Sequence, residues 1–276
     1  MTSPSPFDET ADLALTTLRT SAPASLRPRT LIALGLADAY ASIESPIGSL
    51  FLAFNGLGVS AVELAPDEST FEREHLGHHG RVAHRVATLP VSLSRAIERR
   101  LLGDRRVRVP LDLRGHTEFE RDVWRKTLDI PRGEVRPYGW IAAEIGRPAA
   151  VRAVGTALGH NPVPLIVPCH RVVRSDGHIG QYSLGGPANK RAMLAAEGLD
   201  PDALEELARV GIRYIGSDTT RIFCLPTCRH ARRIMERHLV RFRSAQDGTR
   251  AGYRACLVCR PTHPRRRRMR PVNAVM

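Results

Sequence analysis

Cys169 stands apart from the other cysteines of this chain, and a histidine follows it directly in the segment NPVPLIVPCHRVV. A thiol becomes a strong nucleophile when a neighbouring base or a positive field stabilises its thiolate. His170 is such a base, Glu197 is a candidate to orient it, and Asn161 adds hydrogen-bonding capacity. The alternative is a buried structural cysteine, because free cysteine is among the most buried residue types. Taken alone, the Cys-His pair favours this second interpretation.

The other four cysteines form two close pairs. Cys224 and Cys228 are spaced C-x3-C, and Cys256 and Cys259 are spaced C-x2-C. Two such thiolate pairs are what a tetrahedral four-thiolate zinc site requires. A redox C-x-x-C motif or uncommitted thiols are the alternatives, but each leaves the other pair unexplained. The odd count and the clustering also argue against a disulfide framework. The spacing therefore predicts a zinc site.

The elements expected to position Cys169 are mainly helical. Residues 117–131 predict a helix with one apolar side, and residues 140–146 and 149–158 predict two short helices joined by a Gly-Arg-Pro turn. This succession is the helix-turn-helix pattern. Arg152 points away from the apolar face of the second short helix, where small residues keep the helix slim enough for a narrow groove. A strand-like apolar run leads into Cys169.

The chain before residue 113 predicts an α/β domain. A weakly amphipathic helix is expected at 7–18, and strand patterns begin near Ile43 with a hairpin around Asn55-Gly56. An arginine-rich helix at 91–104 and a strand-like segment at 106–113 follow.

Four histidines lie between residues 67 and 86, at His75, His78, His79 and His84. A metal site is one interpretation. Their spacing is irregular and the segment has no cysteine, so we expect a solvated loop or helix face instead.

The composition favours a polyanionic partner. The formal net charge is +13 over 276 residues, and such a surplus attracts phosphate because each neutralised phosphate releases counterions. No apolar run is long enough to span a bilayer, and the N-terminus lacks a signal-peptide pattern. We therefore expect a cytoplasmic nucleic-acid-binding protein with no membrane partner.

The stretch from Phe119 to Glu197 resembles the O6-alkylguanine-DNA alkyltransferase family, also called methylated-DNA–protein-cysteine methyltransferases. The matching text is IPRGEVRPYGWIAAEIGRPAAVRAVGTALGHNPVPLIVPCHRV, followed by GQY and AAEG. Residues 42–112 resemble the family's smaller N-terminal α/β domain. The resemblance implies single-turnover DNA repair, in which an alkyl group moves irreversibly from O6-alkylguanine to Cys169. O4-alkylthymine is a second candidate substrate.

The same resemblance implies individual roles. His170 and Glu197 would activate Cys169 through a water molecule, and Asn161 would bridge the helix-turn-helix to the active-site loop. The DNA-binding and base-binding roles would fall on Tyr138 (adjacent phosphate), Arg152 (filling the space of the flipped nucleotide), and Tyr182 and Ser183 (recognising the extrahelical guanine). The implied partner is double-stranded DNA, bound by a monomer through the minor groove with little sequence specificity.

The segment containing the paired cysteines resembles the zinc module of the bacterial Ada adaptive-response proteins. That resemblance implies zinc bound by Cys224, Cys228, Cys256 and Cys259, with Cys224 as a second methyl acceptor from DNA methylphosphotriesters. In Ada the module precedes the alkyltransferase domain and an AraC-type domain accompanies it. Here the module follows, and only an arginine-rich tail is expected after it. A purely structural zinc site is the alternative.

Together these features predict an α/β N-terminal domain, a mainly α, winged-helix-like helix-turn-helix alkyltransferase domain, and a small α+β zinc module. The expected divisions are 1–40 (partly helical extension), 41–112 (α/β domain), 113–198 (alkyltransferase domain), 199–263 (zinc module) and 264–276 (disordered basic tail). Three rival functions stay open: a non-catalytic alkyl-lesion binder, a methylation-sensing transcription regulator, and a cysteine hydrolase. Non-catalytic lesion binders lack the reactive cysteine, so Cys169 argues against the first rival. A cysteine hydrolase would need repeated turnover on a small substrate.

Overall fold

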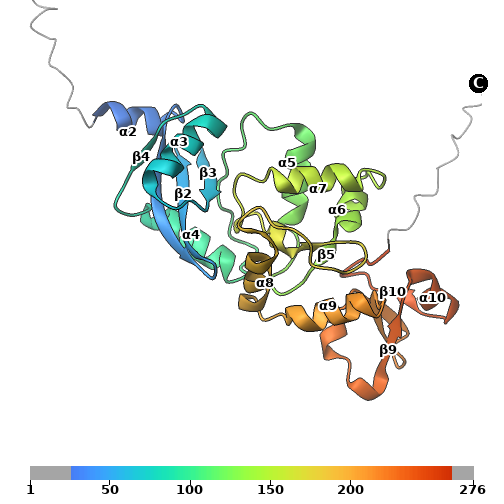
Figure 1. Ribbon diagram of the computed structural model, residues 1–276. Coiled ribbons are helices and arrows are strands. Elements are labelled where there is room, and N and C mark those ends of the chain that lie inside the picture. The colour runs from blue at the N-terminus through green and yellow to red at the C-terminus, as the bar shows by residue number, and fades with distance from the viewer. Residues whose placement is uncertain (1–25, 263–276) are drawn as a thin grey trace, which may run out of the picture.

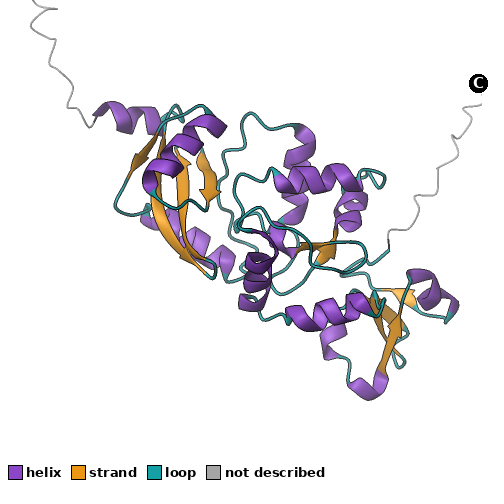
Figure 2. Ribbon diagram, in the orientation of Figure 1, coloured by secondary structure: helices purple, strands orange, loops and turns teal. Residues whose placement is uncertain are grey.

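The structure is a computed structural model that describes residues 26–262, and the helix expected at 7–18 and the basic tail lie outside them. Three groups of elements follow one another along the chain, a sheet with helices, a mainly helical centre and a small second sheet (Figure 1). The chain thus combines helices and sheets and carries a distinct C-terminal module (Figure 2).

The first group is a four-stranded sheet of order β3-β2-β1-β4, in which only the β1–β4 pair is parallel. Its elements are α2 (Leu26–Ala33), β1 (Asp38–Ser45), β2 (Gly48–Asn55), β3 (Gly58–Glu63), α3 (Glu68–His79), β4 (Ala83–Arg85) and α4 (Val91–Leu101).

The hairpin predicted around Asn55-Gly56 is confirmed, because Asn55 pairs with Gly58 where β2 turns into β3. Two other expectations for this group were wrong. Strand β1 begins at Asp38, earlier than the apolar pattern indicated. Residues 106–113 form no strand and contribute one isolated bridge to the sheet. Alternating arginine and valine resembles a strand pattern, but hydrogen bonding to a partner is what makes a strand.

The histidine segment is also different from the expectation of a solvated loop or helix face. It forms α3, but His75 is fully buried, and its Nε2 lies 2.7 Å from Oδ2 of Asp38 on β1. A histidine side chain is amphipathic, so a helix packed on a sheet can bury it where a carboxylate accepts its N–H.

The central group holds the predicted helices. Its elements are α5 (Glu118–Thr127), β5 (Arg136–Pro137), α6 (Tyr138–Glu144), α7 (Val151–Gly159), the short 3-10 helix η1 (Cys169–Arg171), β6 (Val172–Val173) and α8 (Gly186–Ala196). A capping box between Thr117 and Glu120 starts α5. Trp124 of α5 is buried and donates its indole N–H to the carbonyl of Ala157 on α7 at 2.8 Å, which ties these two helices together.

The third group begins where the sequence indicated a boundary. Asp200 caps α9 (Pro201–Arg209) with its side chain, and Pro201 occupies the first turn. The remaining elements are β7 (Tyr214–Ser217), β8 (Ile222–Cys224), η2 (Ala231–Arg233), η3 (Glu236–His238), β9 (Leu239–Phe242), α10 (Ala245–Arg250) and β10 (Arg254–Ala255). The strands form a sheet of order β10-β8-β7-β9.

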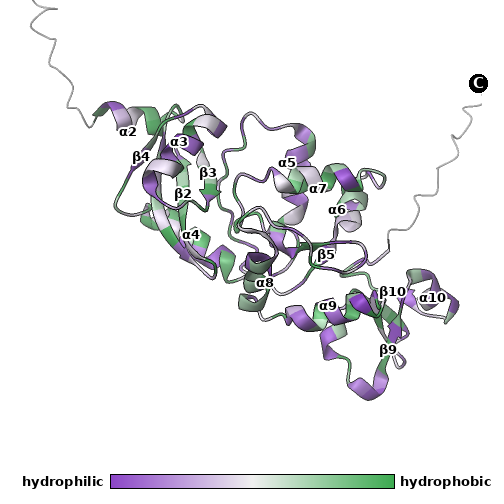
Figure 3. Cartoon of the chain, viewed as in Figure 1, coloured by the Kyte–Doolittle hydropathy of each residue, from purple (hydrophilic) through white to green (hydrophobic). Residues whose placement is uncertain are grey.

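The largest apolar core lies under the first sheet and the central helices, and it includes Leu52, Trp124, Val154 and Cys169 itself. Apolar residues concentrate in the strands of the first sheet, whereas α10 is hydrophilic (Figure 3). Between residues 26 and 262, no helix is long and apolar enough to cross a membrane.

Candidate functional site

Cys169 begins η1 at the end of a buried loop rather than at the end of the strand that the sequence suggested. The loop starts at Asn161, whose side-chain amide donates to Sγ of Cys169 at 3.2 Å and to the carbonyl of Val167 at 3.0 Å. Its amide oxygen accepts from the backbone N–H of Val163 at 3.2 Å. Asn161 therefore holds both ends of the loop and contacts the sulfur directly.

The environment of Cys169 keeps its thiol protonated in the resting protein. Burial raises the pKa of Cys169, while hydrogen bonding from Asn161, the Lys190 charge and the Ser183 hydroxyl act in the opposite direction. Because burial dominates, the thiolate must be generated by transfer of the proton to a base.

His170 is placed to be that base. Its Nε2 lies 2.9 Å from Oε1 of Glu197, and a carboxylate only accepts, so Nε2 carries the proton. Burial lowers the pKa of His170, although Glu197 opposes the shift. Nδ1 is buried without a hydrogen-bond partner among the described residues. The ring therefore holds a free lone pair that can accept a proton.

Glu197 is held as a carboxylate by several donors. Arg171 donates to both of its oxygens at 2.7 to 3.0 Å, and the backbone N–H of Gly133 donates to Oε2 at 3.0 Å. Burial by itself would raise the pKa of Glu197, but hydrogen bonds from His170 and Arg171 lower it to about 2. Gly133 has φ 71°, and an added Cβ would stand 3.1 Å from the Glu197 carbonyl, so any other residue would be strained there.

Lys190 and Arg171 are site residues that the sequence reasoning missed. Lys190 of α8 is fully buried, and its Nζ donates to the carbonyls of Val172 at 2.6 Å and Gln181 at 3.1 Å. Burial lowers the pKa of Lys190 to about 8, with the Cys169 thiolate acting against that shift. Only two lysines occur in a chain rich in arginine, and this scarcity was the one available signal.

The residues expected to contact DNA or the flipped base lie in two parts of the central group. Tyr182 and Ser183 follow β6, whereas Tyr138 and Arg152 belong to α6 and α7. Tyr182 is buried with its hydroxyl unpartnered among the described residues, and Ser183 beside it is exposed. Burial raises the pKa of Tyr182 well above its ordinary value, and the neighbouring Cys169 and Glu197 charges add to the shift. Arg152 is exposed on α7, and Tyr138, the first residue of α6, is half-buried near Cys169.

The structure also gathers the four paired cysteines. Cys224, Cys228, Cys256 and Cys259 are all buried, and their sulfurs lie within 4.8 Å of one another. Backbone N–H groups of Leu225 and Val258 donate to the sulfurs of Cys259 and Cys256, at 3.4 Å each. Four converging sulfurs with backbone donors fit a tetrahedral zinc ion, which keeps its thiolates ionised when bound. A cavity of about 420 Å³ reaches Cys224 and Cys256 but not the other two ligands.

The zinc module packs directly on α6 and on the segment that leads into it. Trp140 donates its indole N–H to the carbonyl of Cys259 at 2.9 Å, and the hydroxyl of Thr227 accepts from the backbone N–H of Val135 at 2.8 Å. Arg260 pairs with Glu144 at the end of α6 at 2.6 Å. The two parts of the molecule are therefore joined by buried hydrogen bonds and an ion pair.

These features define a class of protein, one in which a buried cysteine beside a histidine–glutamate pair is joined to a four-cysteine metal-binding domain. The profile of the family described as "6-O-methylguanine DNA methyltransferase, DNA binding domain" matches residues 118–199, and that of the "Metal binding domain of Ada" matches residues 208–262. The C-terminal module is accordingly a zinc-binding domain.

Individual relatives agree with these matches. A methylated-DNA–protein-cysteine methyltransferase of Mycobacterium tuberculosis is 42% identical over 161 residues, which cover 57% of this chain and 91% of that relative. The chain therefore belongs to the methylated-DNA–protein-cysteine methyltransferase family. One of Methanosarcina acetivorans is 38% identical over 147 residues, 53% of this chain and 90% of that relative. The crystal structure of Mycobacterium tuberculosis OGT in complex with DNA is similar at 39% identity and a TM-score of 0.47, covering 58% of this chain and 92% of that one.

Proposed function

We propose that Cys169 is the residue that accepts the alkyl group when this DNA-repair methyltransferase acts on O6-alkylguanine. The observation that carries the assignment is the buried hydrogen bond from Asn161 to Sγ, next to a histidine whose tautomer Glu197 fixes. The four remaining cysteines lie together in the zinc module, so the central group offers no other thiol. O4-alkylthymine is a second substrate candidate.

The proposed reaction moves one proton and one alkyl group. His170 takes the thiol proton from Cys169, through a water molecule, and the thiolate attacks the alkyl carbon of the lesion. The S–C bond forms as the C–O6 bond breaks, and the guanine that leaves takes up one proton, equal to the one the thiol lost. The product is a thioether, which is a very poor leaving group, so each molecule reacts once.

Mass spectrometry of the digested protein after incubation with O6-methylguanine DNA tests this assignment. The peptide that contains Cys169 should gain about 14 Da, as S-methylation requires. Cys169→Ser should bind the same DNA and leave the lesion unrepaired. Repair by Cys169→Ser, or repaired DNA beside an unmodified Cys169 peptide, would contradict the proposal and favour a different acceptor.

We further propose that α6 and α7 form a helix-turn-helix, within a winged-helix-like domain, that binds the minor groove. Arg152 is exposed on a helix of small residues, and Tyr138 begins the preceding helix near Cys169. The O6 position lies inside the duplex, so the base must leave the stack at a cost of a few kcal/mol. Arg152 fills the vacated space, Tyr138 contacts the adjacent phosphate, and Tyr182 with Ser183 holds the guanine. Contacts to backbone and lesion imply little sequence specificity, and the protein acts as a monomer.

The same proposal divides the chain into an extension (1–40), an α/β domain (41–112), the alkyltransferase domain (113–198), the zinc module (199–263) and a basic tail (264–276). Five cysteines that form no disulfide suit a reducing compartment, so we place its action in the cytoplasm.

A second methyl acceptor in the zinc module is supported by the shape of its surface. Cys224 lines the cavity beside His230, Arg233 and Arg254, whereas Cys228 and Cys259 do not line it. In the proposed transfer the Cys224 thiolate takes the methyl group of a methylphosphotriester, and the phosphodiester leaves as an anion. Methylphosphotriester DNA offered to the full chain with Cys169→Ala should add a methyl group to the Cys224 peptide. A methyl group on Cys256, which lines the same cavity, would make Cys256 the acceptor instead. The absence of any adduct would show that the zinc site is purely structural.

A further inference from the structure

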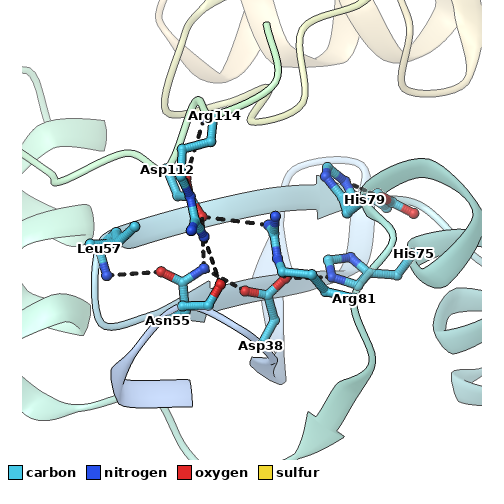
Figure 4. A network of polar contacts seen from close by, with 10 residues as sticks. Asp38, Asn55, Leu57, His75, His79, Arg81, Asp112 and Arg114 are labelled. Carbon is cyan, nitrogen blue, oxygen red and sulfur yellow. Dashed lines mark hydrogen bonds and ion pairs between the residues drawn. The ribbon is translucent and has the colours of Figure 1, made fainter. Parts of the chain in front are cut away.

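A second group of metal-ligand side chains lies in the first sheet, outside both sites described above. Glu63 at the end of β3 and His75 and His79 of α3 offer ligand atoms that all lie within 4.8 Å of one another. The two histidines are one helical turn apart and therefore share a face of α3. Figure 4 shows their rings one above the other, with His75 directed at Asp38, and the ring centroids are 4.5 Å apart.

His75 has the hydrogen-bonding pattern of a metal-bound histidine. Its side chain is completely buried, and Nε2 lies 2.7 Å from Oδ2 of Asp38. The carboxylate only accepts, so Nε2 carries the proton and Nδ1 is left with a lone pair. Nδ1 is buried and has no hydrogen-bond partner in the part of the chain that the structure describes. Metal-bound histidines donate their second nitrogen to a carboxylate in this way, which fixes the tautomer.

The spacing of the other two ligands also suits an ion. Nε2 of His79 and Oε1 of Glu63 are 3.6 Å apart, which is too long for a hydrogen bond. Two ligands that each lie about 2.0–2.1 Å from a tetrahedral zinc ion are separated by roughly 3.4 Å. The ligand nitrogen of His75 lies within 4.8 Å of the other two ligand atoms, so it needs to approach them by at most roughly 1.4 Å, within the range of a small side-chain rotation.

Charge and access are consistent with a divalent cation. Arg81 neutralises Asp38 at 3.1 Å and also approaches Asp112 at 3.5 Å, so Glu63 supplies the negative charge of the ligand set. Glu63 and His79 line a cavity of about 620 Å³. An ion therefore reaches these two ligands from solvent, while His75 closes the site from the protein interior.

We propose that Glu63, His75 and His79 form a second divalent-metal site, of the His-His-carboxylate type that suits Zn²⁺ and neighbouring first-row cations. The set has three protein ligands and leaves a further position open toward the cavity. Binding links α3 to β3, so the ion stabilises the N-terminal part of the chain.

Metal content tests the site with the full-length protein, whose four-cysteine site is kept loaded with zinc. Protein saturated with Zn²⁺ and passed through gel filtration should contain one equivalent more than the cysteine site accounts for. Glu63→Gln and His79→Ala should each lose that equivalent. His78→Ala is the matched control, because His78 is a neighbouring histidine of the same helix and cavity but not of the ligand group, and it should keep the equivalent.

A Co²⁺ titration gives a readout that a folding defect would not produce. The cysteine site yields intense thiolate-to-cobalt charge-transfer bands in the near ultraviolet. The second equivalent should add only weaker visible bands, and His79→Ala should abolish this second step alone. Wild-type protein that retains a single equivalent, or a second equivalent that His78→Ala removes as readily as His79→Ala, would overturn the proposal.

Discussion

Glu197 connects the chemistry of Cys169 to the stability of the fold, because one carboxylate accepts from His170, Arg171 and the backbone of Gly133. The residue is buried, so its charge is favourable only while these donors remain in place. At the residue scale, the catalytic geometry and the packing of α8 therefore depend on the same ionised group.

The lowered pKa of Glu197 predicts a specific acid sensitivity. Its pKa is about 2 in the folded chain and near the ordinary 4.5 when unfolded, so its contribution is complete above about pH 5 and is lost as the pH falls toward 2. That contribution is on the order of 3 kcal/mol. Glu197→Gln should be less stable at pH 7 and show a flatter loss between pH 5 and 3 in urea denaturation. Glu206→Gln, which removes an exposed partner of Arg209, should keep the wild-type profile.

Lys190 is predicted to lower the pKa of the Cys169 thiol through its buried charge. Lys190→Met should raise that pKa and slow transfer from free O6-benzylguanine by roughly tenfold at neutral pH, since one pKa unit is a factor of ten. The pH dependence of Cys169 alkylation by iodoacetamide measures the shift directly. Lys126→Met, which removes the other lysine of the chain, a partly buried residue of α5 paired with Asp129, is the control. An unchanged pKa of the Cys169 thiol in Lys190→Met would show that Lys190 has only a structural role.

At the scale of elements, α7 has one face in the core and one face exposed. Its buried residues Val154, Ala157 and Leu158 face the core, while Arg152 is exposed on the other side. Because Arg152 does not contribute to the buried face, its substitution is expected to leave the fold intact.

Arg152→Ala should slow repair of duplex DNA much more than transfer from free O6-benzylguanine, which requires no base flipping. Arg152→Lys keeps the charge but loses the planar guanidinium, so it should recover DNA affinity more than it recovers the repair rate. Single-turnover kinetics on both substrates make the comparison. Equal slowing on the two substrates would indicate a defect in the guanine pocket.

At the scale of the whole molecule, the zinc module is in contact with α6, the first helix of the proposed helix-turn-helix. The carbonyl that accepts from Trp140 belongs to Cys259, which is itself a zinc ligand. Loss of the metal therefore disturbs a residue that holds α6, although Cys169 lies in a different part of the chain.

Removal of zinc by a chelator should slow transfer from duplex DNA by roughly tenfold, the effect of losing a buried hydrogen bond of about 1.5 kcal/mol. Transfer from free O6-benzylguanine should change little, because Asn161, His170 and Lys190 do not contact the module. Trp140→Phe with zinc bound should act in the same direction. Equal rates on duplex DNA with and without zinc would show that the module and α6 work independently.

The sequence by itself determined the features that depend on near neighbours. The hairpin at Asn55-Gly56, the helix that follows Thr117 and the Asp200-Pro201 start of α9 are local features, and the structure contains each of them. The four zinc ligands were also predictable, since paired cysteines carry their own spacing.

Only the tertiary structure decided which distant side chains meet and which charges are buried. No periodicity or motif in the sequence predicts the contacts of Lys190 with Cys169, Arg171 with Glu197, His75 with Asp38, or Trp140 with Cys259. Burial of a charged or polar group is favourable only when a partner from another element supplies the matching charge or hydrogen bond. That partner is brought into place by the packing of the whole chain, so a linear pattern of residues does not reveal it.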